Sequence, residues 1–145
     1  MNNVNQTTGF LQAVPLFHGL SNQQLENLGK RMVKRVYASG QPIITQGQGG
    51  EGFFLIVSGK AEAFRERSDG IKSMVNSFTE KDFFGEMALL DDGPRTASVI
   101  ATEPTECLVL TRWDFFSALR ESDVEMSIIM LQELAKRFRR ALDTL

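Results

Sequence analysis

The chain has 145 residues, of which 42% are hydrophobic and 23% charged, the composition of an ordinary globular protein. Its 16 basic and 18 acidic residues give a formal net charge of −2, so bulk charge does not indicate a nucleic-acid binder. The single cysteine, Cys107, and the single histidine, His18, exclude an internal disulfide framework, Cys-based zinc sites, HExxH zinc chemistry and two-His iron sites. We therefore expect no metal site.

The length predicts one domain. No apolar run approaches the 18 or so residues of a membrane span, so no membrane association is expected. The N-terminal segment MNNVNQTTGF is polar and uncharged, which is typical of neither a secretory signal nor a transit peptide. These features together predict a cytoplasmic location.

The first predicted elements are helical. Residues 1–8 are poor in apolar side chains and are predicted to form a loose arm, with the domain proper at 9–145. Apolar residues at 10–17, interrupted by Pro15, predict a short helix and then a turn. Ser21 followed by Gln24 has the spacing of a capping box, so a second helix is predicted at 22–31.

The middle of the chain alternates short runs rich in Val, Ile and Phe with Gly, Pro, Asp and Ser. Strands are predicted at 33–37, 42–45, 53–57, 61–65, 73–78, 97–101 and 107–111. Short strands at this spacing favour an antiparallel, jelly-roll-like β-roll over βαβ units.

Helix signals return at the end. Thr111 with Asp114 predicts a helix through about residue 120, and Ser122 with Glu125 predicts a long helix through about residue 142. The predicted fold class is therefore α+β, mainly β: an antiparallel β-roll flanked by N-terminal helices and a long C-terminal helix.

The most informative segment is DFFGEMALLDDGPRTASVIA, residues 82–101. Gly85 precedes a short run of helix formers, and the free N–H groups at such a helix start favour a phosphate. Arg95 is suited to a charge-assisted contact with phosphate, whereas the Glu86 carboxylate is suited to accepting a hydrogen bond from a sugar hydroxyl. The segment thus indicates a sugar-phosphate pocket. The alternative is that Arg95 and Glu86 simply pair with each other.

FGEMALLDDGPRTASV resembles the phosphate-binding cassette of cyclic-nucleotide-binding domains, the family of catabolite activator protein and of the regulatory subunits of cyclic-AMP-dependent protein kinase. Upstream, Gly47, Gly50, the run FFLIV at 53–57 and Gly59 resemble the family's glycine-punctuated hairpin. The resemblance covers residues 10–142 and implies a ligand, cyclic AMP or less favourably cyclic GMP, with no further cofactor.

The resemblance also implies a role for each site residue. Gly85 would let the backbone approach the ligand, and the N–H groups of Met87, Ala88 and Ala97 would face the cyclic phosphate. Arg95 would bind the phosphate oxygens, and Glu86 would hold the ribose 2′-hydroxyl. Thr96 would offer its hydroxyl to the phosphate or to a guanine amino group, and Val75 would pack against the base. Asn76 would read a guanine edge only if it turned inward.

Other chemistry-bearing residues have simpler interpretations. His18 is expected at a turn and Cys107 in a buried strand. The basic run at 136–140 favours a solvated helix face near a C-terminus over a nucleic-acid site. A helix-turn-helix would need about twenty residues beyond Leu145, so direct DNA binding by this chain is not expected.

The last predicted helix carries a heptad seam of apolar residues at spacings of 4 and 3, namely Val124, Ile128, Leu131, Ala135, Phe138, Leu142 and Leu145. Its neighbouring face is also apolar, so the helix needs two partners, and one of them is predicted to be the same helix of a second subunit. A wide stripe packed on the β-roll is the alternative. The lid over the base is predicted to come from Leu134, Arg137, Phe138 or Ala141.

The sequence therefore predicts a regulatory sensor, not an enzyme, that binds a cyclic nucleotide and moves its C-terminal helix, with a homodimer and an effector protein as partners. A scaffold or interaction module with a redundant pocket is the alternative. A β-roll metalloenzyme is disfavoured because only one histidine is present.

Overall fold

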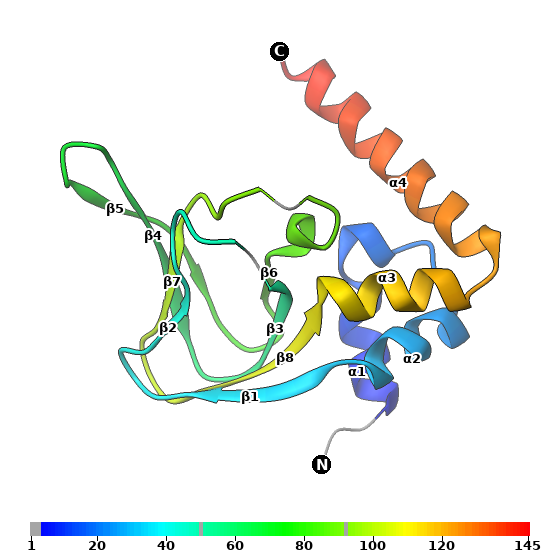
Figure 1. Ribbon diagram of the computed structural model, residues 1–145, viewed down its shortest axis with the longest axis horizontal. Coiled ribbons are helices and arrows are strands. Elements are labelled where there is room, and N and C mark those ends of the chain that lie inside the picture. The colour runs from blue at the N-terminus through cyan, green and yellow to red at the C-terminus, as the bar shows by residue number, and fades with distance from the viewer. Residues whose placement is uncertain (1–3, 50, 92) are drawn as a thin grey trace. The chain divides into compact units, whose positions relative to one another are not determined.

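The computed structural model describes residues 4–49, 51–91 and 93–145. These form two compact units, one comprising residues 32–112 and the other combining the N-terminal residues up to 31 with residues 113–145. The strands all belong to the first unit and the long helices to the second (Figure 1).

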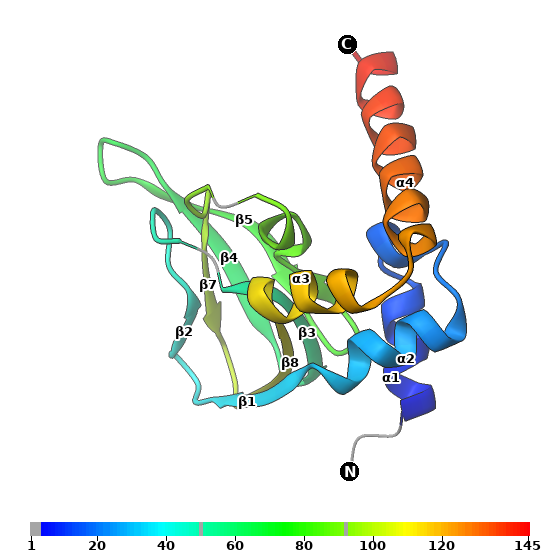
Figure 2. The ribbon, with the colours of Figure 1, turned by 45° about the vertical axis from the view of Figure 1, so that its right-hand side comes forward.

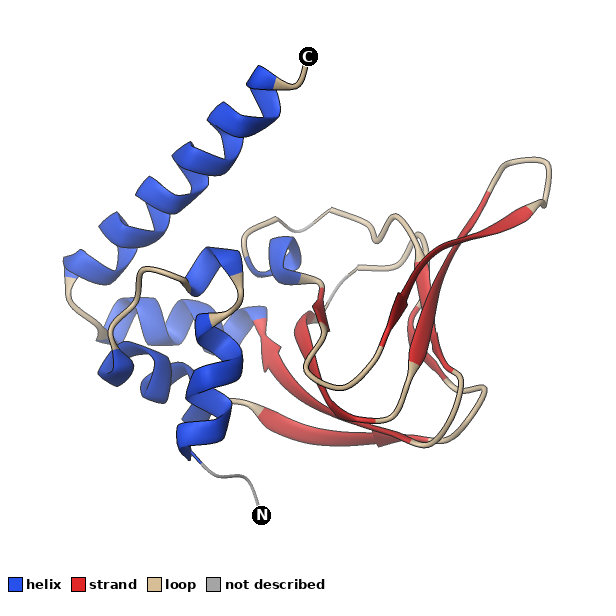
Figure 3. Cartoon of the chain, turned by 180° about the vertical axis from the view of Figure 1, so that it is seen from behind, coloured by secondary structure: helices blue, strands red, loops and turns tan. Residues whose placement is uncertain are grey.

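The strand-rich unit consists of two antiparallel sheets. In one the order is β1 (Val33–Tyr37), β8 (Thr105–Thr111), β3 (Gly52–Ser58) and β6 (Phe83–Phe84). In the other it is β2 (Pro42–Ile44), β7 (Ser98–Ala101), β4 (Ala61–Glu66) and β5 (Lys72–Phe78). The β4–β5 hairpin projects beyond the neighbouring strands (Figures 1 and 3), and Figure 2 shows β2, β7, β4 and β5 following one another across their sheet.

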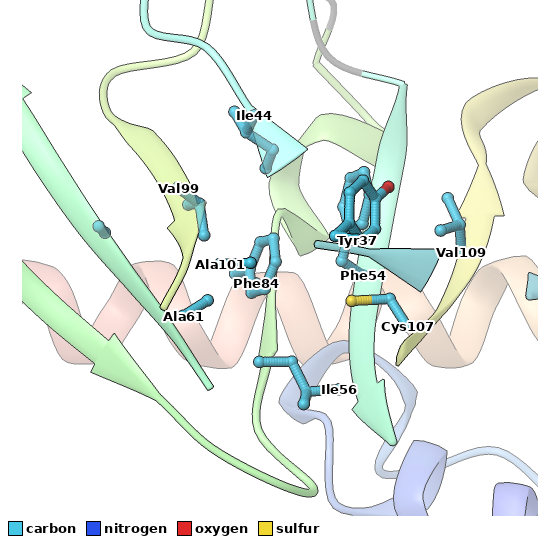
Figure 4. Packing of buried hydrophobic residues seen from close by; sticks show 11 residues of the cluster. Tyr37, Ile44, Phe54, Ile56, Ala61, Phe84, Val99, Ala101, Cys107 and Val109 are labelled. Carbon is cyan, nitrogen blue, oxygen red and sulfur yellow. The ribbon is translucent and has the colours of Figure 1, made fainter. Parts of the chain in front are cut away.

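The core of this unit lies between the two sheets, because alternate residues of each strand point to the same face. Buried side chains from both sheets form one cluster (Figure 4): Tyr37, Ile44, Phe54, Ile56, Ala61, Ala63, Phe84, Val99, Ala101, Cys107 and Val109. The rings of Phe54 and Phe84 stack at a centroid distance of 5.2 Å, which ties β6 to β3. This packing fixes the position of Phe84, near the start of the segment 82–101 that carries the predicted site residues.

All seven predicted strands are present, each within two residues of its predicted bounds. The eighth strand, β6, was not among the predicted strands, because two residues are too few to give an alternating pattern. The predicted one-turn helix is the 3₁₀ turn η2 (Glu86–Leu89).

The helical unit contains α1 (Val4–Gln12), the 3₁₀ turn η1 (Pro15–Phe17), α2 (Asn22–Lys30), α3 (Arg112–Glu121) and α4 (Val124–Asp143). The predicted capping box is confirmed: the Ser21 hydroxyl accepts from the Gln24 N–H, and the Gln24 side chain accepts from the Ser21 N–H. Phe17 and Phe115 pack at 6.3 Å between ring centroids, and Arg31 pairs with Glu121. The predicted fold class, an antiparallel β-roll with N-terminal helices and a long C-terminal helix, is confirmed.

Two details of the helical prediction were wrong. Residues 4–8 belong to α1 rather than to a loose arm, since Thr7 and Thr8 are buried and the Thr7 methyl lies close against Gly29 of α2; residues 1–3 lie outside the described part. The N-cap of α4 is Asp123, whose carboxylate accepts from the Met126 N–H, and not Ser122. A carboxylate one residue later offers the same acceptor with a charge that suits the helix start.

Candidate functional site

A cavity of about 480 Å³ opens in the β-roll unit between the β4–β5 hairpin and the segment that links β6 to β7. All eight residues that the sequence predicted as ligand-binding line it: Val75, Gly85, Glu86, Met87, Ala88, Arg95, Thr96 and Ala97. The remaining lining residues are Ile44, Ala63, Arg65, Asn76, Phe78, Phe84 and Val99. Residues 22 positions apart in the chain are thus brought to one place by the pairing of β4 with both β5 and β7.

Gly85 allows the chain to turn sharply from β6 into η2. Its φ is +83°, in the left-handed region that L side chains avoid. A Cβ built on it would lie 2.6 Å from the carbonyl oxygen of Gly52 and 2.8 Å from Nη1 of Arg95. Both the conformation and the close approach therefore require glycine here.

The turn η2 contributes Glu86, Met87 and Ala88 to the cavity lining. The Ala88 N–H donates to the Gly85 carbonyl oxygen at 3.0 Å within the turn, so a phosphate would share that donor rather than receive it alone. Glu86 lies partly buried on the same turn, and Met87 is about half exposed at 49%. The turn thus supplies one carboxylate to the cavity lining.

Arg95 is held in place through both its backbone and its side chain. Its N–H donates to Gln48, its carbonyl accepts from Gly47, and its Nη2 donates to the carbonyl oxygen of Gly52 at 2.7 Å. Burial lowers the pKa of Arg95, and the charge of Glu51 acts in the opposite direction. Glu51 is thus the carboxylate whose charge raises the pKa of Arg95, and the Arg95 side chain donates to Gly52, so neither observation supports the alternative of an Arg95–Glu86 pair.

A second cavity, of about 380 Å³, includes Arg35, Tyr37 and Glu51 in its lining. Arg35 pairs with Glu51, and that hydrogen bond raises the pKa of Arg35. Arg95 borders both cavities. Glu51 thus pairs with Arg35, and its charge also acts on Arg95.

Arg65 is the polar lining residue that sequence reasoning missed. The inner face of β4 carries Ala61 and Ala63, and Arg65 continues that alternation at the open end of the cavity. The period-two pattern was present in the sequence and could have found it. With Arg95 and Arg65 against Glu86, the cavity has an excess of one positive charge, which suits a phosphate monoanion.

The four lid candidates lie on α4, in the helical unit. Leu134 and Arg137 are partly buried, whereas Phe138 and Ala141 are exposed. Their assignment stays a prediction.

Among the residues that the structure describes, no group of three or more His, Cys, Asp or Glu side chains could hold a metal ion, and no helix has the length and apolar character of a membrane span. His18 is exposed beside η1, and Cys107 is buried in β8, as predicted for each. Gly50 and Asp92, which belong to the motifs quoted above, lie outside the described residues.

Comparison with known proteins gives a consistent result. The family model of the cyclic nucleotide-binding domain matches residues 34–122. The cyclic AMP receptor protein of Thermus thermophilus is 33% identical over 91% of this chain and 69% of its own length. A cAMP-dependent protein kinase regulatory subunit of Aspergillus niger is 37% identical over 73% of this chain, which spans only 25% of that protein.

Solved structures agree. The N-terminal domain of a transcriptional regulator from Streptomyces coelicolor superposes with a TM-score of 0.86 at 28% identity, covering 94% of each chain. The Thermus thermophilus catabolite activator protein superposes with a TM-score of 0.71 at 34% identity, over 90% of this chain and 59% of that one. From the cavity, the cassette and these similarities together, the chain belongs to the cyclic nucleotide-binding domain family.

Proposed function

We propose that this chain is a regulatory sensor that binds a cyclic nucleotide, cyclic AMP in preference to cyclic GMP, in the cavity between the β4–β5 hairpin and the β6–β7 segment. One observation carries the proposal: a half-buried arginine, a carboxylate and a glycine-initiated turn line a single cavity with an apolar sheet face. The preference for cyclic AMP is supported by the relatives, a cyclic AMP receptor protein and regulatory subunits of a cAMP-dependent kinase.

Arg95 is the anchor of the proposed complex. Its guanidinium binds the cyclic phosphate, together with the N–H groups of Met87, Ala88 and Ala97, because charge-assisted bonds in a desolvated site are the strongest that the cavity offers. Glu86 accepts from the ribose 2′-hydroxyl. Thr96 donates its hydroxyl to the phosphate or accepts from a base amino group.

The base contacts the sheet. Val75, 46% exposed on β5, is free to be covered by a purine ring, and Ala63 and Val99 extend the apolar surface on β4 and β7. Covering this surface removes apolar area from water and favours binding.

The output of the sensor is a change in the position of α4. The ligand shifts the equilibrium between two positions of α4 only if it binds the protein better in one position than in the other. We propose that Leu134, Arg137, Phe138 or Ala141 gives this difference by contacting the base as a lid. In this proposal the chain has a binding role and no catalytic one. The movement of α4 is sensed by an effector protein or by the oligomer itself, in the cytoplasm. No direct DNA contact is proposed.

A homodimer through α4 is part of this proposal. The heptad seam is exposed along its whole length, with Leu131 64% and Phe138 67% exposed, while Met126 and Met130 are buried. The helix thus presents a second, unpartnered apolar face of the kind that an isologous contact covers.

The proposal is tested by calorimetry and thermal unfolding with cyclic AMP, cyclic GMP and cyclic dinucleotides. A ligand that binds only the folded chain stabilises it by about 2.7 kcal/mol at a hundred times its dissociation constant. That raises the melting temperature by about 5–10 °C for a chain of this size. Absence of binding and of any shift at millimolar concentrations of every cyclic nucleotide would refute the proposed function.

A further inference from the structure

Two polar side chains of the β4–β5 hairpin line the cavity. Arg65 lies on β4 and Asn76 on β5, and Asn76 is paired with Ala63 across the hairpin. The other cavity-lining side chains of this sheet are Ile44, Ala63, Val75, Phe78 and Val99, which are apolar. Discrimination between bases by hydrogen bonds from the sheet therefore depends on Arg65 and Asn76.

The structure fixes which hydrogen-bonding groups these two residues offer. Arg65 donates from Nε to the carbonyl oxygen of Thr96 at 3.2 Å, which positions the guanidinium at the cavity while its two terminal nitrogens remain as donors. The Oδ1 atom of Asn76 accepts from the Ser77 N–H at 2.9 Å, and because a backbone N–H needs an acceptor, this bond identifies the oxygen. The Asn76 side chain therefore offers chiefly its NH₂ group, and both residues present donors.

A pair of donors discriminates between purines. The Hoogsteen edge of guanine carries two acceptors, O6 and N7, which an arginine contacts in a bidentate manner. The same edge of adenine carries one acceptor, N7, beside the N6 amino group, which is itself a donor. An arginine at this edge thus gains a second bond with guanine and meets an unfavourable donor–donor contact with adenine.

We infer that Arg65, assisted by Asn76, is a base-reading residue that contacts the O6 and N7 acceptors of a 6-oxopurine and so adds affinity for cyclic GMP. The inference rests on the proposed function, because it needs a cyclic nucleotide in the same cavity. It extends the ligand range of a site that the relatives' names link to cyclic AMP.

The test is calorimetry with cyclic AMP, cyclic GMP and cyclic IMP on the wild type, Arg65→Met and Arg67→Met. Cyclic IMP has O6 and N7 but no 2-amino group, so it separates Arg65 from the contact that Thr96 would make with the guanine amino group. Arg67→Met is the matched control, because it also removes one positive charge from the hairpin. Arg67 pairs with Asp69 at 2.5 Å and does not line the cavity. Melting temperatures without ligand verify that both variants fold.

We expect Arg65→Met to raise the dissociation constants of cyclic GMP and cyclic IMP about tenfold, the range of one base contact. That of cyclic AMP is expected to stay the same or to fall, because the unfavourable contact with the adenine amino group is removed. Arg67→Met leaves all three unchanged. Equal losses for the three nucleotides would place Arg65 at the shared phosphate and overturn the inference, as would no change at all. A wild type that bound none of the three would overturn the proposed function as well, which is a distinguishable result.

Discussion

Gly85→Ala tests whether the cavity depends on a close backbone approach. The substitution carries two costs: a left-handed φ of +83°, and a Cβ placed 2.6 Å from the Gly52 carbonyl oxygen and 2.8 Å from Nη1 of Arg95. The Gly52 oxygen cannot move freely, because Gly52 is paired with Thr111 in the sheet. We therefore expect both a less stable fold and a displaced guanidinium.

Gly70→Ala separates the two costs. Gly70 has nearly the same conformation, φ +86°, at the tip of the β4–β5 hairpin, but a Cβ there would meet no described atom within 4 Å. The left-handed conformation costs alanine roughly 1–2 kcal/mol, part of which is offset by the lower entropy of the unfolded chain. Gly70→Ala is thus expected to cost about 1 kcal/mol.

The steric overlap at Gly85 adds about 1–3 kcal/mol, the usual range for an overpacked site, so Gly85→Ala is expected to cost about 2–4 kcal/mol in total. At about 3 °C per kcal/mol, the melting temperature falls by about 3 °C for Gly70→Ala and by about 6–12 °C for Gly85→Ala. Calorimetry should also show that Gly85→Ala raises the dissociation constant of cyclic AMP at least about tenfold, whereas Gly70→Ala leaves it unchanged. Equal melting temperatures for the two variants would refute the reasoning, because they would mean that the chain relaxes around the new methyl group.

The remaining predictions concern a charge, an interface and a thiol. Arg95→Met is expected to raise the dissociation constant of cyclic AMP in calorimetry by at least about 30-fold, because it removes the charge opposite a buried anion. An unchanged dissociation constant would contradict the assignment of Arg95 to the phosphate. Leu131→Glu with Phe138→Glu is expected to give a folded monomer in analytical ultracentrifugation, since it places like charges across a two-fold contact; a wild type already monomeric at high micromolar concentration would contradict the dimer. Burial raises the pKa of the Cys107 thiol to about 12, so at pH 8 almost no thiolate is present, and an aromatic disulfide reagent should modify Cys107 only after unfolding. Rapid modification of the native protein would show that β8 opens readily.

The strands and the site segment were predictable because their signals are local. Alternating apolar residues and glycine turns placed the seven longer strands within two residues of their bounds. The cassette, read with the resemblance it carries, predicted eight residues that do line one cavity. Gly85, η2 and Arg95 are close in sequence, so the sequence contains most of that geometry.

Long-range contacts were not predictable in the same way. Nothing in the sequence indicated that Arg95 would donate to the carbonyl of Gly52, 43 residues away, or that the charge of Glu51 would act on it. Those contacts exist because β3 pairs with both β6 and β8, which brings residues 51 and 52 to the start of η2. Pairing of this kind depends on the whole sheet, so a local pattern cannot specify it.

The sequence by itself determined the fold class, the family and the residues of the cassette, because each of these depends on periodicity or on a short ordered motif. Only the tertiary structure decided that Arg65 shares the cavity, since the antiparallel pairing of β4 with β5 and β7 brings its side chain to Thr96, in a cavity that Asn76 also lines. In the sequence, Arg65 is one of 16 basic residues. It becomes part of a binding site because the paired strands bring the other lining residues to it.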